Sequence, residues 1–127
     1  MNRVITALLC CPVMFLVGCS KLNFNQTVEL TTGEVKTFFI DPPKSDQKVV
    51  VTINSTDAEL SYGVVLSKNF KESVELSDVS DKDNFLLIKH KVKQDTQSIT
   101  IPAKEEVVVL VGNSTKNTTV SVSLKSE

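Results

Sequence analysis

The sequence predicts an all-β protein, a single antiparallel β-sandwich of about eight strands. Apolar and polar residues alternate along most of the chain, which is the pattern of strands with one buried face. Turn-forming residues separate the alternating segments. Beyond the N-terminal apolar stretch, no amphipathic helix of three turns can be drawn.

Each expected strand follows from this alternation. In chain order the segments are 28–30, 34–40, 49–54, 60–67, 86–93, 98–101, 107–111 and 120–124. Thr32-Gly33 is expected to form a turn, and Asp41-Pro42-Pro43 ends the second strand because proline cannot donate to a strand ladder. Segment 107–111 is continuously apolar, which is typical of a central strand covered on both faces.

Two connections are less regular. Residues 68–84 show no clear period, and we expect a short strand at Val74–Leu76 or one helical turn there. The Asn/Ser/Thr-rich run 112–119 is predicted to form a hairpin connection.

The N-terminal residues have the pattern of a cleaved export signal. Arg3 precedes an apolar stretch from Val4 to Val17, which is shorter than the ~20 residues of a membrane-spanning helix. It ends in Leu16-Val17-Gly18-Cys19, which resembles the lipobox of bacterial lipoproteins. That resemblance implies cleavage before Cys19, a diacylglycerol thioether on its sulfur and a third acyl chain on its amine.

The expected organisation follows from this cleavage site. Residues 1–18 form the signal peptide, 19–26 the lipidated cysteine with a short tether, and 27–127 the β-sandwich domain. Ser20 stands where lipoproteins retained at the inner membrane often carry Asp, so the resemblance implies the outer membrane, with the domain facing the periplasm. Cys10 and Cys11 leave with the signal, so the processed chain has no partner for a disulfide.

A second resemblance concerns the domain. Ser55–Leu60 is similar to the "DADL" turn-to-strand signature of bacterial pre-peptidase C-terminal domains, with Glu59 where the second acid of the signature is usually Asp. Gly33–Ile40 and Ile99–Ala103 also resemble segments of that family. The resemblance implies a jelly-roll-like β-sandwich that acts as an accessory module, in some members with bound Ca²⁺.

Candidate chemical groups are few. His90 is the only histidine, and the alternation places it with Ile88 and Val92 on one strand face, as a partly buried side chain. Asp78, Asp81 and Asp83 share one acidic loop that could supply oxygen ligands to Ca²⁺. This loop lacks the EF-hand spacing and glycine, so a solvated loop is the expected alternative and no metal is assigned.

A row of lysines and the overall composition restrict the ligands. Lys89, Lys91 and Lys93 are expected on one strand face, as a charged surface or protected edge, with a phospholipid-headgroup contact as the alternative. The net charge is −1 and Arg3 is the only arginine, which argues against nucleic acid. The absence of Trp argues against a flat sugar platform.

The sequence therefore predicts a lipid-anchored, non-catalytic binding or accessory module for a protein partner. It shows no cofactor motif, no small-molecule site and no catalytic constellation. The alternatives are a structural envelope lipoprotein without a dedicated ligand, or a calcium-binding accessory module. An exposed apolar patch favours partner binding, whereas a uniformly charged surface favours the structural role.

The lipobox generates the first testable prediction. Because Cys19 supplies the only thiol at the expected cleavage site, Cys19→Ala is expected to leave the precursor uncleaved or to release a soluble form. Detergent phase partitioning of cell envelopes measures this loss. Unchanged membrane association together with a trimmed N-terminus contradicts lipidation at Cys19.

Overall fold

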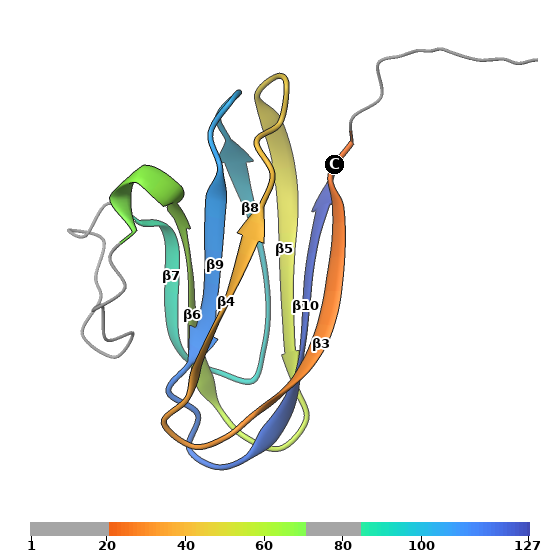
Figure 1. The fold of residues 1–127 in the computed structure, drawn as a ribbon. Coiled ribbons are helices and arrows are strands. Elements are labelled where there is room, and N and C mark those ends of the chain that lie inside the picture. Colours follow the sequence, from red (N-terminus) through yellow and green to blue (C-terminus); the bar gives the residue numbers. More distant parts are fainter. Residues whose placement is uncertain (1–20, 71–84) are drawn as a thin grey trace, which may run out of the picture.

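Two four-stranded antiparallel sheets pack face to face in the computed structural model, which describes residues 21–70 and 85–127 (Figure 1). The strands are β3 (Asn23–Leu30), β4 (Val35–Ile40), β5 (Gln47–Ser55), β6 (Leu60–Leu66), β7 (Phe85–Val92), β8 (Gln94–Ile101), β9 (Val107–Gly112) and β10 (Thr118–Ser126). A short 3₁₀ turn, η1 (Ser67–Asn69), follows β6. The predicted all-β sandwich of eight strands is confirmed.

The order of the strands is that of a jelly roll. One sheet runs β3-β10-β5-β8 and the other β4-β9-β6-β7. Among the described strands, only β6 and β7 are consecutive in the chain and belong to one sheet, and every other connection between them crosses between the sheets. The segment between β9 and β10 is therefore not the expected hairpin, because it joins a strand of one sheet to a strand of the other.

Branched aliphatic side chains fill the space between the sheets. From one sheet come alternate residues of β5 and β10, such as Val51, Ile53 and Val122, and from the other come alternate residues of β6 and β9. Tyr62 lies in the same core, fully buried, and its hydroxyl donates a 2.5 Å hydrogen bond to the Asp95 carboxylate on β8 of the opposite sheet. Burial and this bond raise the pKa of Tyr62, so the phenol stays protonated and neutral in the core.

Strand β9 is buried on both faces, as its continuous apolar sequence predicts. Val107, Val109 and Val111 face the core between the sheets. Val108 and Leu110 face outward and form a second cluster with Val65 of β6. Partly buried side chains pack over this cluster: Phe70, Phe85 and Ile88.

Glycine at position 63 makes this second layer possible. A Cβ at Gly63 would lie 2.7 Å from ring carbons of Phe85 and 3.0 Å from Ile88. Real Cβ atoms essentially never approach so closely, so only glycine lets the Phe85 ring lie directly against β6.

The expected turn at Thr32-Gly33 is also present. Gly33 has φ = +81°, a conformation that glycine adopts without steric cost. The Glu34 N–H donates to the Thr31 carbonyl at 3.0 Å. In return, the Thr31 N–H donates to the Glu34 carboxylate, which lowers the pKa of that side chain.

Several strands extend further than the alternation indicated. The first begins at Asn23 rather than Val28, and β8 begins at Gln94 rather than Ser98. Apart from Phe24, both extensions consist of polar residues, and they pair with a full-length neighbour, β3 with β10 and β8 with β5. Cross-strand pairing thus overrides the weak local preference of these residues for extended structure. The possible strand at Val74–Leu76 lies outside the described residues.

The double burial of β9 generates a prediction about stability. Val109→Asp places a carboxylate between the sheets, at a cost of several kcal/mol against a typical total stability of about 5–15 kcal/mol. We expect this variant not to fold, whereas Thr96→Asp on the exposed face of β8 is expected to unfold near the wild-type temperature. Thermal circular dichroism of the processed chain measures both. A cooperative, wild-type transition for Val109→Asp contradicts the described core.

Candidate functional site

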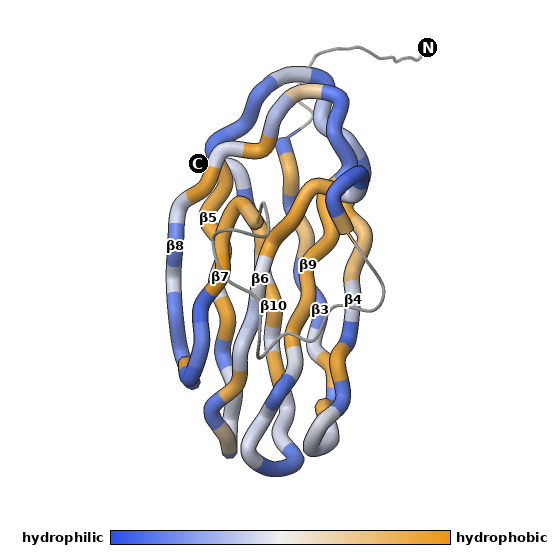
Figure 2. Tube along the Cα trace, turned by 90° about the vertical axis from the view of Figure 1, so that its left-hand side faces the viewer, coloured by the Kyte–Doolittle hydropathy of each residue, from blue (hydrophilic) through white to orange (hydrophobic). Residues whose placement is uncertain are grey.

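The two outer faces of the sandwich differ in chemistry. On the sheet β4-β9-β6-β7 the strand registers place the following residues in neighbouring rows: Phe39, Val108, Val65 and Phe85, then Thr37, Leu110, Gly63 and Ile88. We call these two rows, together with Val35 and Phe70, the apolar outer face. Figure 2 shows the hydrophobic character of β6 and β9 in this sheet.

Two apolar side chains of this face are open to solvent. Phe39 is 56% exposed and Val35 is 39% exposed, and these are the exposed large hydrophobic residues within 21–70 and 85–127. Both lie on β4, which is an edge strand and pairs with β9 alone. Phe39 makes an edge-to-face contact with Phe70, with ring centroids 6.3 Å apart. The apolar outer face therefore presents an aromatic pair and Val35 beside the buried cluster of Val65, Val108 and Leu110.

The opposite outer face is polar. Its neighbouring rows contain Asn25, Ser123, Thr52 and Thr96, then Thr27, Ser121, Asn54 and Gln94. The Thr27 and Ser121 hydroxyls lie 3.2 Å apart, so these side chains already bond to one another. A surface of short hydroxyl and amide side chains offers little apolar area that binding could remove from water. The apolar outer face is therefore the candidate interaction surface.

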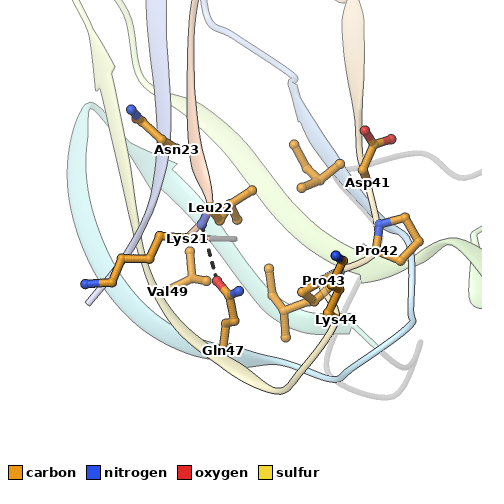
Figure 3. Close-up of a pocket in the computed structure, with 11 residues that line it drawn as sticks. Lys21, Leu22, Asn23, Asp41, Pro42, Pro43, Lys44, Gln47 and Val49 are labelled. Atoms are coloured by element: carbon orange, nitrogen blue, oxygen red, sulfur yellow. Dashed lines mark hydrogen bonds between the residues drawn. The ribbon is translucent and has the colours of Figure 1, made fainter. Parts of the chain in front are cut away.

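A pocket opens at the end of the sandwich where residue 21 enters the fold, which we call the near end. The pocket has a volume of about 240 Å³. Its floor consists of buried core residues, Ile40, Val49 and Ile101. Its mouth is lined by Lys21, Leu22, Asn23, Asp41, Pro42, Pro43, Lys44 and Gln47 (Figure 3). The volume is below the roughly 300 Å³ at which sites for drug-sized ligands begin.

Gln47 fixes the start of the first strand at this mouth. Its side-chain carbonyl accepts a hydrogen bond from the Leu22 N–H at 3.3 Å (Figure 3). The same oxygen accepts a bond from the Ser126 hydroxyl, and that hydroxyl oxygen accepts a second bond from the Leu22 N–H at 2.8 Å. The two ends of the described domain are thus held together beside the pocket.

His90 differs from its expected environment. It is exposed rather than partly buried, and its Nδ1 lies 3.0 Å from the Ser61 hydroxyl. It shares the outward face with Ile88, but Val92 packs into the core on the other side of the sheet. The alternation fails because the β6–β7 register shifts between Leu60 and Tyr62 and because Lys91 has φ = +58°.

The Ser61–His90 contact has the atom types of a nucleophile and its base. Ser61 is only 2% exposed, however, so a substrate carbonyl cannot approach its hydroxyl. His90 also does not line the near-end pocket or the shallow polar pocket between Glu29 and Asp57. Hydrogen bonding within the sheet accounts for this pair.

The lysine row is less regular than expected. Lys89 lies within β7 and is partly buried, whereas Lys91 is exposed at the bulge and Lys93 lies in the turn before β8. The Lys93 carbonyl accepts a bond from the Ser55 N–H, which places this turn at the end of the sandwich opposite the pocket. We call that opposite end, with the turns 31–34, 56–59 and 113–117, the far end. The expectation that Lys89, Lys91 and Lys93 lie on one strand face is therefore wrong, because the bulge at Lys91 breaks the alternation.

Other candidate residues lie outside the described part of the chain. These are Cys19 and the acidic residues Asp78, Asp81 and Asp83. Among residues 21–70 and 85–127, no cluster of three or more His, Cys, Asp or Glu side chains has an arrangement that could hold a metal ion. No helix of this described part is long and apolar enough to cross a membrane.

The fold is similar to a solved structure. The comparison protein is PliG of Aeromonas hydrophila, a periplasmic lysozyme inhibitor of g-type lysozyme, with a TM-score of 0.54 and 12% sequence identity. The similarity covers 91% of this chain and 94% of that one. No protein-family model matches the sequence, and no curated protein matches it. The likeness establishes a shared β-fold between this chain and a periplasmic inhibitor.

Proposed function

We propose that the protein is a non-catalytic, protein-binding lipoprotein, anchored through Cys19 in the outer membrane with its domain in the periplasm. The exposed Phe39 and Val35 on edge strand β4 are the observation that carries this proposal. Exposed apolar side chains grouped on one rigid face are typical of protein-interaction sites, whereas a structural lipoprotein has no need of them. A structural lipoprotein without a ligand is expected to have a uniformly charged surface. The apolar outer face differs from that expectation.

The arrangement on β4 suits an aromatic anchor. Phe39 has more than half of its surface available to a partner, and Phe70 already restrains one side of its ring. A restrained aromatic side chain loses little conformational entropy on binding, and such residues contribute a large share of binding energy at interfaces. Val35 extends the apolar contact along the same strand face.

A g-type lysozyme is the first partner that we propose. The similar fold of PliG belongs to a protein described as an inhibitor of that enzyme class. An inhibitor acts by binding a protein and needs no catalytic group of its own, which agrees with the buried Ser61 beside His90. Because one β-sandwich scaffold serves many functions, the choice of lysozyme is tested separately from the binding surface.

The apolar outer face generates the prediction on function. Phe39→Ser is expected to weaken the complex of the purified lipoprotein with g-type lysozyme by about tenfold or more, because a central aromatic contact is typically worth about 2 kcal/mol. Thr96→Ala on the polar outer face serves as the matched control and is expected to leave the affinity unchanged. Isothermal titration calorimetry measures the affinity, and hydrolysis of a peptidoglycan suspension measures inhibition.

A second experiment separates the surface from the partner. A photo-crosslinking amino acid at the exposed position 37, beside Phe39, is expected to give one discrete protein adduct in intact cells, and the same residue at position 96 is expected to give none. An adduct with a protein other than a lysozyme supports the proposed protein-binding module but contradicts lysozyme as its partner. The absence of any adduct at position 37 contradicts protein binding through β4.

A further inference from the structure

The near end of the sandwich is a tightly connected surface. The Lys104 N–H donates to the Pro43 carbonyl at 2.7 Å, and the Ala103 N–H donates to the Asp46 carboxylate at 2.8 Å. These bonds join the loop before β5 to the loop after β8. The start of β3 is fixed beside them by Gln47 and Ser126. The position of residue 21 relative to the pocket is therefore defined by the fold.

The expected anchor lies very close to this surface. Only Ser20 lies between Cys19 and Lys21 in the sequence, and the two peptide steps from Cys19 to Lys21 span about 7 Å when fully extended. A thioether-linked glycerol lies at the level of the lipid headgroups, whose layer is several Å deep on each side of the bilayer. A domain with so short a link cannot stand away from that layer.

The chemistry of the near end fits such a contact. The pocket mouth presents Leu22 and the rings of Pro42 and Pro43, and neither proline carries an N–H that would lose hydration. Lys21 and Lys44 flank the mouth, where an ammonium group on a long stem can reach phosphate oxygens while its methylenes lie against apolar surface.

The charges of the near end are mixed. Asp41 lies in the same pocket lining as the two lysines. Lys68 is paired with Glu105 at 3.1 Å in the adjoining loops. Attraction to anionic lipid is thus a minor contribution, and the anchor together with the apolar mouth determines the orientation.

We propose that the near end, with its pocket open toward the bilayer, docks on the phospholipid surface of the membrane that holds the Cys19 anchor. This inference rests on the anchored form of the proposed function. The strands then stand away from the membrane, and the far end points into the periplasm. Strand β3 has eight residues and spans roughly 26 Å, so Lys91 and Lys93 at the far end lie beyond the reach of the headgroups.

This orientation also affects the apolar outer face. Strand β4 runs from the far end to the near end, so Val35 lies farther from the membrane than Phe39. The strands of this face are then roughly perpendicular to the membrane plane, so its rows of residues lie at different distances from the bilayer. A partner reaches it from the side, parallel to the bilayer, without displacing lipid.

Fluorescence quenching in proteoliposomes tests the orientation. The processed chain has no cysteine besides the acylated Cys19, so a fluorophore on Lys44→Cys or Lys116→Cys labels one site at the near or far end. Vesicles of phosphatidylethanolamine and phosphatidylglycerol carry a nitroxide on the headgroup. We expect the label at position 44 to be quenched several times more strongly than the label at position 116, with little change at high salt.

Each other outcome has a distinct meaning. Equal quenching at both positions, or stronger quenching at position 116, overturns the docked near end. Loss of the quenching at high salt shows a purely electrostatic contact and overturns the role of the anchor and the apolar mouth. Flotation of the same vesicles and the mass of the N-terminal peptide report on the anchor. A protein that does not float and carries no lipid overturns the anchor and the orientation together.

Discussion

Burial of β9 on both faces is the constraint on which the rest of the structure depends. Residues 21–127 contain no cysteine, so no disulfide can hold the two sheets together. The valines of β9 that face inward join the core between the sheets, while Val108 and Leu110 join the outer cluster. Its neighbours β4 and β6 are aligned by this strand, because each pairs with it over six residues. One strand therefore connects the core to the candidate interaction surface.

The need to cover β9 on its outer side explains why the two outer faces differ. Apart from Val50, the outer residues of β5, β8 and β10 are polar, and polar side chains require no cover. Val65, Val108 and Leu110 are instead covered by Phe70, Phe85 and Ile88, and the absence of a side chain at Gly63 gives Phe85 its place. Toward edge strand β4 this apolar layer becomes exposed at Phe39 and Val35. The proposed binding surface is thus the open margin of a second hydrophobic layer.

Sequence patterns predicted the fold better than the surface. Alternation identified each strand and the doubly covered segment 107–111, because burial imposes a period of two on inward residues. The start of β3 is not evident from the sequence because polar Gln26 interrupts the alternation between Phe24 and Val28, and only its pairing with Val122 of β10 shows the strand. The bulge at Lys91 leaves no pattern in the sequence, so strict alternation assigns Val92 to the same face as His90, whereas Val92 packs into the core. Exposure of Phe39 depends on which strand lies at the sheet edge, and only the strand order shows that.

Hydrogen exchange tests the central role of β9 most directly. If this strand is the most deeply buried part of the domain, its amides open only when the whole domain unfolds. We expect the amides of residues 107–111 to exchange most slowly, at the rate of global unfolding, and the amides of edge strand β3 to exchange sooner. Nuclear magnetic resonance of the processed chain resolves the individual amides. Exchange of the β9 amides as fast as that of the β3 amides contradicts the central role of β9.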